Sequence, residues 1–132
     1  MYKFIGLFLG FTVLMMSCSN TKKTVTEQDP YDPALLVGVW KIEKEVCCGR
    51  NAVVTYGGTK ELTIKAKDNV YILRENGVVL EKGTYKVDLK SEFGPVVTFD
   101  QQFPAMYQID GNTLILNWGY MDLQEETYKR VR

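Results

Sequence analysis

The side chains able to do chemistry are few in this sequence, and their types argue against catalysis. The chain contains no histidine, so the commonest general base and metal ligand is absent. Glu43 and Glu45 share one face of an expected strand, whereas Glu125 and Glu126 point to opposite faces. Such pairs usually supply solvating charge, and no glycine-rich loop opens a helix to hold a nucleotide phosphate. We therefore predict that the protein is not an enzyme and needs no cofactor.

The adjacent residues Cys47 and Cys48 are the second feature with chemical potential. Neighbouring Cα atoms lie about 3.8 Å apart, below the usual disulfide range of about 4.4–6.8 Å, so a bond between the two would be strained. Three alternatives stay open: a vicinal disulfide acting as a redox-sensitive kink, two thiols of which one packs inward, or bonds to another chain. A structural role is favoured over redox sensing or capture of a soft metal. We predict no metal site, because adjacent thiolates span a zinc tetrahedron poorly and histidine is absent.

The N-terminal residues have the three parts of a secretory signal. Lys3 gives a charged start, residues 4–16 form an apolar run, and Ser17 is a small residue at the cut site. The run is too short for a membrane-spanning helix, which needs about 20 residues. Cys18 follows directly, and this arrangement resembles the lipobox of bacterial lipoproteins. The resemblance implies a signal peptide at 1–17 and a lipidated Cys18 that carries acyl chains such as palmitate. A plain secreted protein and an N-terminal membrane anchor are the alternatives.

A lipidated Cys18 would place the protein in the bacterial cell envelope, attached to the membrane by its lipid. Ser19 and Asn20 lack the Asp that marks inner-membrane retention in some bacteria, so we expect the outer membrane. Removing the signal peptide takes Lys3 away and leaves 15 basic against 16 acidic side chains. Because a balanced chain has no broad electrostatic field, nucleic acid is not expected as a partner. The sequence does not indicate a protein partner.

Residues 18–34 are predicted to form a flexible tether before a folded domain at 35–132. They carry no apolar period, and the Asp-Pro pairs at 29–30 and 32–33 disfavour helix. Polar segments that bury no apolar surface stay mobile. We expect this tether to hold the domain away from the bilayer.

From residue 35 onward, apolar and polar residues alternate, as is typical of half-buried β-strands. Eight strands are predicted, at residues 35–46, 59–67, 70–74, 78–89, 95–99, 105–110, 113–118 and 123–131. Links as short as 68–69 favour antiparallel neighbours, because parallel pairing needs a long crossover. The predicted fold is all-β: an eight-stranded antiparallel up-and-down barrel, a meander whose closure removes exposed edges. An open sandwich is the alternative, and Gly83 inside the fourth strand predicts a bulge or bend.

Two short motifs stand in the first and last predicted strands, Gly38-Val39-Trp40 and Tyr128-Lys129-Arg130. Together they resemble the lipocalin-like branch of the calycin barrels, which includes domains of small bacterial lipoproteins. The resemblance implies that Gly38, Trp40 and Arg130 close one end of the barrel, with the guanidinium over the indole ring. Arg132 has the same parity as Arg130 and is an alternative partner. The helix that usually follows a lipocalin barrel has no counterpart here.

An eight-stranded barrel is either filled by its own side chains or holds one small ligand. Many residues with inward parity are bulky: Trp40, Ile42, Leu62, Ile64, Tyr85, Val87, Phe99, Tyr107, Ile109, Leu114, Leu116 and Trp118. The long link at 47–58 is a candidate lid over the barrel mouth. Candidate ligand contacts at the mouth are Arg50, Tyr56, Tyr107 and Tyr120, against the alternative of an ordinary surface loop with packed tyrosines. We predict that the domain binds a small apolar or amphipathic molecule at the mouth. The alternative is a non-enzymatic structural or interaction protein with a filled barrel.

Overall fold

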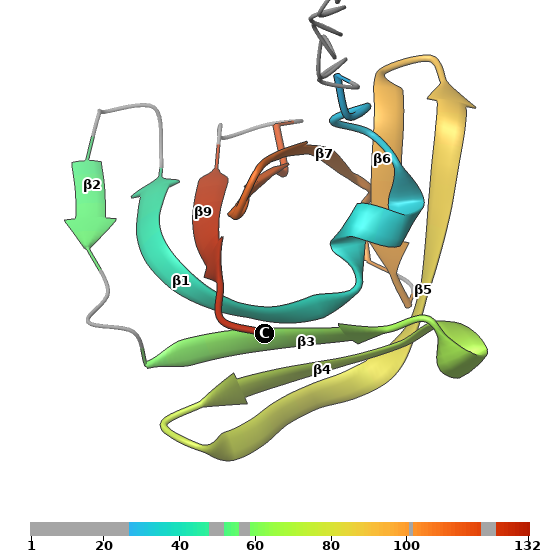
Figure 1. The fold of residues 1–132 in the computed structure, drawn as a ribbon. Helices are drawn as coiled ribbons and strands as arrows, with labels where there is room; N and C mark the ends of the chain where they lie inside the picture. Colours follow the sequence, from blue (N-terminus) through green and yellow to red (C-terminus); the bar gives the residue numbers. More distant parts are fainter. Residues whose placement is uncertain (1–26, 48–51, 56–58, 101, 120–123) are drawn as a thin grey trace, which may run out of the picture.

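Strands dominate the computed structural model, which describes residues 27–47, 52–55, 59–100, 102–119 and 124–132. Within these residues nine strands form one sheet, accompanied by two short 3₁₀ helices (Figure 1). The strands are β1 (Gly38–Cys47), β2 (Ala52–Thr55), β3 (Lys60–Lys65), β4 (Val70–Glu75), β5 (Val78–Ser91), β6 (Gly94–Phe99), β7 (Ala105–Asp110), β8 (Thr113–Asn117) and β9 (Glu125–Arg130). The helices are η1 (Pro33–Leu36) and η2 (Lys67–Asn69).

The sheet closes on itself through its first and last strands. β1 pairs with β9 from Trp40↔Arg130 to Val46↔Glu125, and every other pairing between the barrel strands is also antiparallel. In the part of the chain that the structure describes, β2 pairs only with β1, so the barrel wall consists of the other eight strands. The predicted eight-stranded antiparallel meander barrel is confirmed, and the open-sandwich alternative is wrong.

The two ends of the barrel differ. At one end, the closed end, β1, β4, β6 and β8 begin. At the other end, the mouth, these strands finish and β3, β5, β7 and β9 begin. η1 leads directly into β1 and packs into the closed end, where Leu36 is fully buried.

The first strand starts later than predicted, because residues 33–36 form η1 instead of extended chain. Asp32 caps this turn, its carboxylate accepting a hydrogen bond from the Ala34 amide at 2.9 Å, and Pro33 suits the first helical position. Burial of Leu36 then holds the turn against the barrel.

The described end of the predicted tether is likewise packed. The carbonyl of Pro30 accepts a hydrogen bond from the Ile109 amide at 2.9 Å. The ring of Tyr31 meets the edge of Tyr107, with 6.5 Å between ring centroids. These contacts differ from the expectation of mobility up to residue 34, because Tyr31 has an aromatic partner that the local sequence does not reveal.

β2 is a second difference, since the sequence predicts that residues 52–55 belong to the link at 47–58. β3 pairs with β1 only from Gly38 to Lys41, which leaves the same edge of β1 open nearer the mouth. β2 covers that edge, in a register from Lys44↔Thr55 to Cys47↔Ala52. Pairing satisfies backbone groups that would otherwise form an exposed strand edge. This part of the candidate lid is therefore part of the sheet.

The core lies inside the barrel, where alternation along each strand places it. Of the residues predicted to point inward, all are buried except Val87 and Trp118, which are partly buried against the core. Additional core members are Leu36, Tyr71, Val97, Ala105 and Tyr128.

Gly83 serves a purpose other than the predicted bulge. The register of β4 against β5 shifts between Leu73↔Glu81 and Arg74↔Val79, so that Leu80 is the extra residue. Gly83 itself pairs regularly with Tyr71. A Cβ at Gly83 would lie 1.8 Å from Oδ2 of Asp100, so the glycine permits the close approach of this carboxylate.

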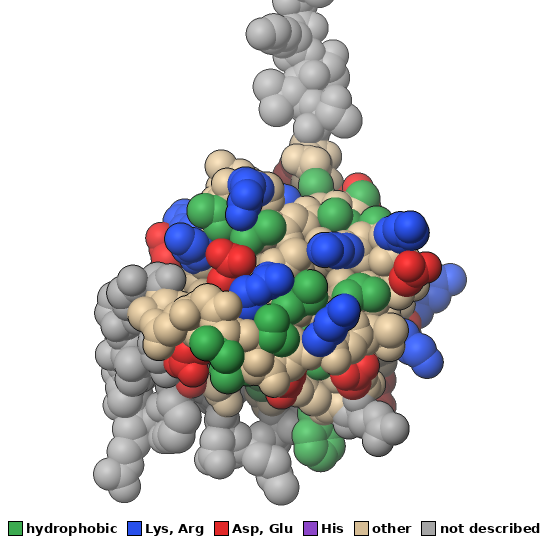
Figure 2. Space-filling view, turned by 90° about the horizontal axis from the view of Figure 1, so that it is seen from below, with side chains coloured by type: hydrophobic (Ala, Val, Ile, Leu, Met, Phe, Trp, Pro, Cys, Tyr) green, Lys and Arg blue, Asp and Glu red, His purple; other side chains and the backbone are tan. Residues whose placement is uncertain are grey.

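The outer surface carries charges of both signs. Figure 2 shows one face, seen from below Figure 1, on which basic, acidic and hydrophobic side chains are interspersed. No helix in the described residues is long and apolar enough to cross a membrane.

Candidate functional site

The closed end is held by Trp40 and Arg130, which the register of β1 and β9 places opposite each other. The guanidinium carbon of Arg130 lies 4.1 Å from the centroid of the Trp40 ring, a cation–π geometry. The guanidinium also donates hydrogen bonds to the carbonyls of Val37 at 2.7 Å and Leu35 at 2.5 Å. The indole Nε1 of Trp40 donates to the Leu36 carbonyl at 2.8 Å. One cation thus ties the last strand to the indole and to the backbone around η1.

Gly38 completes this arrangement. Its φ of 152° lies in a region that side-chain-bearing residues rarely adopt. A Cβ there would lie 2.6 Å from Nη1 of Arg130 and 2.8 Å from the Arg132 carbonyl. The structure therefore brings Gly38, Trp40 and Arg130 together. Arg132 contributes a backbone carbonyl, which accepts from the Val39 amide at 2.8 Å, while its side chain is exposed.

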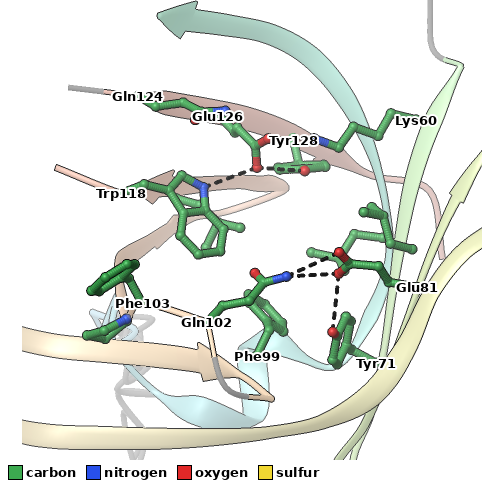
Figure 3. Close-up of a pocket in the computed structure, with 14 residues that line it drawn as sticks. Lys60, Tyr71, Glu81, Phe99, Gln102, Phe103, Trp118, Gln124, Glu126 and Tyr128 are labelled. Carbon is green, nitrogen blue, oxygen red and sulfur yellow. Dashed lines mark hydrogen bonds and ion pairs between the residues drawn. The ribbon is translucent and has the colours of Figure 1, made fainter. Parts of the chain in front are cut away.

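A pocket of about 990 Å³ opens at the mouth. It lies in the interior of the barrel, enclosed by the strands, and Figure 3 shows it in close-up. Its walls consist of Lys60, Leu62, Tyr71, Leu73, Glu81, Phe99, Gln102, Phe103, Pro104, Leu116, Trp118, Gln124, Glu126 and Tyr128. The barrel is therefore filled toward the closed end and open toward the mouth.

The apolar part of the pocket is largely aromatic. The rings of Phe99 and Trp118 have centroids 6.1 Å apart, and Tyr71 meets Phe99 edge-on at 4.9 Å. Leucine side chains from β3, β4 and β8 contribute the aliphatic surface. Phe103, on the link between β6 and β7, is 79% exposed although it lines the pocket, so it stands at the rim.

One polar cluster of the pocket is centred on Glu126, which is 4% exposed. Lys60 Nζ lies 2.5 Å from one carboxylate oxygen. The other oxygen accepts hydrogen bonds from the Tyr128 hydroxyl at 2.8 Å and from Trp118 Nε1 at 3.4 Å (Figure 3). The buried charge is therefore paired and hydrogen-bonded, as burial of a carboxylate requires.

The second polar cluster lies on the opposite side, around Tyr71. The Tyr71 hydroxyl is 3.3 Å from Oε2 of Glu81 and 3.2 Å from Oδ2 of Asp100. The Gln102 amide nitrogen lies 3.0 and 3.2 Å from the two Glu81 oxygens (Figure 3). Burial, together with the charges of Glu81 and Asp100, raises the pKa of Tyr71, so its hydroxyl stays protonated and acts as a donor.

Tyr107 does not line the mouth pocket, although it was a candidate contact there. Its side chain is buried, and its hydroxyl donates to the carbonyl of Tyr31 on the segment before η1. The side chain points into the barrel, as its position in the strand predicts. The ring, however, extends toward the N-terminal segment and not toward the pocket. Burial, followed by the charges of Asp29 and Asp32, raises the pKa of Tyr107 to about 12.

Most of the other predicted site residues lie where the structure gives no description. Cys18, Cys48, Arg50, Tyr56 and Tyr120 lie outside the described residues. Cys47 is the last residue of β1, where its backbone pairs with Ala52. The described residues contain no group of three or more potential ligands that could hold a metal ion.

The sequence did not indicate that the polar residues of the pocket would lie there, namely Lys60, Tyr71, Glu81, Gln102, Gln124 and Glu126. For Glu126 a signal existed, because it shares the parity of Tyr128 and Arg130 in the last strand. An acidic residue with inward parity predicts a buried carboxylate that requires a partner.

The closed antiparallel barrel and its sealed end are compatible with a calycin-like fold. No family model matches the sequence, and no match was found among curated proteins or among solved structures.

Proposed function

We propose that this protein is a lipid-anchored lipoprotein of the bacterial cell envelope whose lipocalin-like barrel binds a small apolar or amphipathic molecule. The export signal and Cys18 support the anchor, and the N-terminal pattern favours the outer membrane. The observation that carries the binding proposal is the pocket of about 990 Å³ at the mouth.

The pocket has the composition expected of a ligand site. Small-molecule pockets typically enclose about 300–1,000 Å³ and combine apolar walls with a few polar groups. Here Phe99, Trp118 and the leucines form the apolar wall, while the Glu126 and Tyr71 clusters supply polar groups. Such a pocket suits a molecule with an apolar body and one polar end.

A non-enzymatic interaction protein is the second candidate. Val78, Val79 and Leu80, where β5 begins at the mouth, are each at least half exposed. Exposed apolar residues grouped in this way are found at protein interfaces. Under this alternative, the outer surface meets a protein partner and the pocket has no ligand.

Native mass spectrometry after mild purification separates the two candidates. A small molecule that remains bound supports the proposal, whereas a clean mass with a reproducible protein partner supports the alternative.

A matched pair of substitutions tests whether the pocket is the site. Leu73→Trp fills the pocket from β4, whereas Leu89→Trp adds the same side chain at an exposed position of β5 outside the pocket. We expect Leu73→Trp to weaken the binding of an environment-sensitive apolar dye by at least about tenfold. Leu89→Trp should leave the affinity for the dye unchanged. Equal binding by both variants would contradict the pocket proposal.

A further inference from the structure

The charges around the pocket select between classes of amphipathic ligand. Resting on the proposed binding function, we propose that the preferred ligand carries a cationic, ammonium-type polar end, which is received by Glu81 beside the aromatic wall. The cavity receives the apolar body of the ligand, and the charged side chains around it favour one kind of polar end.

The only basic side chain among the described lining residues is already engaged. Lys60 is paired with Glu126 at 2.5 Å, and its side chain is 20% exposed. A ligand carboxylate would have to compete with Glu126 for this ammonium group, and it would do so beside a second negative charge. Like charges held close together raise the free energy of the complex. The pocket therefore disfavours an anionic head group.

Glu81, unlike Lys60, has no oppositely charged partner within the described residues. The ion pairs found there are Lys60 with Glu126 and Arg74 with Glu61. Among the described residues, Glu81 receives only neutral donors, the Gln102 amide and the Tyr71 hydroxyl. Tyr71 has one proton to offer to both Glu81 and Asp100. Glu81 is exposed, so water can also reach its carboxylate, but a cation that enters the pocket would supply the neutralising charge.

The aromatic side chains around this carboxylate favour the same ligand. Phe99, Trp118 and Tyr71 all line the pocket, and Figure 3 shows Gln102 lying between Trp118 and Glu81. The face of an aromatic ring attracts a cation, and this attraction grows when water is excluded. An ammonium group in the space now taken by the Gln102 amide would lie against Glu81, whose partner Tyr71 packs on Phe99, in a pocket that Trp118 also lines.

The lining residues that the structure describes carry a net negative charge. Glu81 and Glu126 contribute two negative charges and Lys60 one positive charge, and Asp100 lies next to the same Tyr71 hydroxyl. An alcohol donates a hydrogen bond but carries no charge. Its affinity should therefore be lower than that of the cationic ligand and higher than that of the anionic ligand.

Three probes with the same alkyl chain test this inference: dodecyltrimethylammonium, dodecanol and dodecanoate, each below its aggregation concentration. Displacement of an apolar dye from the full-length protein at neutral pH gives their relative affinities. We expect the ammonium probe to bind at least about tenfold more tightly than the carboxylate.

Two variants locate the preference. Glu81→Gln keeps the shape of the side chain but removes its charge, whereas Glu75→Gln removes an exposed charge at the mouth end of β4 that does not line the pocket. We expect Glu81→Gln to reduce the preference for ammonium over dodecanol to about twofold or less and Glu75→Gln to preserve it. Unchanged near-ultraviolet circular dichroism of both variants controls for folding.

The outcomes separate this inference from the function on which it rests. Failure of all three probes to displace the dye would contradict the binding function itself. Equal or tighter binding of dodecanoate would overturn the charge inference and leave the binding function standing. A preference that survives Glu81→Gln, or that Glu75→Gln removes equally, would also overturn it.

Discussion

Arg130 illustrates how much one side chain can organise in a small barrel. Its planar guanidinium stacks on Trp40 and donates to two backbone carbonyls beside η1. Lysine cannot reproduce this geometry, because an ammonium group has no planar fork of donors.

We predict that Arg130→Ala lowers the free energy of unfolding by about 2–4 kcal/mol, because it removes charged hydrogen bonds and the cation–π contact. Arg130→Lys should recover part of this loss. Arg132→Ala is the control, because its side chain is exposed, and it should change stability by less than about 0.5 kcal/mol. Urea denaturation followed by circular dichroism measures all three. An Arg130→Lys variant as stable as the wild type would contradict the stacking and fork geometry.

Tyr107 predicts a loss of stability at alkaline pH. Its pKa rises from the ordinary 10.0 to about 12 in the folded protein, so the folded state keeps a proton that the unfolded state releases. The stabilisation is complete below pH 10 and is lost as the pH rises toward about 12. Urea midpoints should fall across this window.

Tyr107→Phe should make that fall shallower, because phenylalanine keeps the ring but has no ionisable hydroxyl. Some slope should remain, since burial also raises the pKa of Tyr71 and Tyr85. A slope unchanged by Tyr107→Phe would show that the Tyr107 hydroxyl does not titrate in this window.

At the scale of elements, β5 joins two parts of the barrel wall. Its first half pairs with β4, and its second half, from Tyr85 onward, pairs with β6. Asp100, directly after β6, stabilises the junction. Its carboxylate accepts a hydrogen bond from the Thr84 amide at 2.8 Å, and its own amide donates to the Thr84 carbonyl at 2.7 Å. Gly83 makes room for this brace.

We predict that Gly83→Ala costs about 1–3 kcal/mol, because the new methyl group overlaps the Asp100 carboxylate. Combined with Asp100→Ala, which removes the obstacle, its additional cost should shrink by at least about 1 kcal/mol. Combination with Asp88→Ala, farther along β5, should be additive to within about 0.5 kcal/mol. Urea denaturation of the single and double variants gives these couplings, and additivity with Asp100→Ala would contradict the proposed contact.

At the scale of the whole molecule, the described chain enters at the closed end and the pocket opens at the mouth. Pro30 and Tyr31 contact β7 before η1 seals the closed end. The proposed anchor, Cys18, precedes these contacts in the sequence. The proposed site of membrane attachment and the proposed ligand pocket therefore belong to different parts of the sequence.

We predict that cells expressing the protein incorporate labelled palmitate into it through Cys18. Cys18→Ser should abolish the label and release the protein from the membrane fraction, because the lipid is its proposed membrane contact. Cys47→Ser and Cys48→Ser should keep the label and serve as controls. Retention of label in Cys18→Ser would contradict the lipobox interpretation.

The strands were predictable because the information that specifies them is local. Alternation over a few residues defines a strand, and a two- or three-residue link requires an antiparallel neighbour. The pairing of Trp40 with Arg130 also followed from the sequence, by resemblance, because the motifs occupy the first and last strands of a closed meander. The sequence did not predict β2, because the pairing of this strand depends on how far β3 extends along β1.

The pocket belongs to the tertiary structure. The sequence by itself determined an all-β chain, its strand order and most inward positions, because strand periodicity and short links act within a few residues. Only the assembled barrel decided that bulky side chains fill the closed end while the mouth stays open, and that Lys60 meets Glu126 while Glu81 meets Tyr71 and Gln102. Lys60 and Glu126 lie 66 positions apart in the chain, and Glu81 and Gln102 lie 21 apart. These contacts therefore depend on register, closure and the summed volume of side chains from many strands.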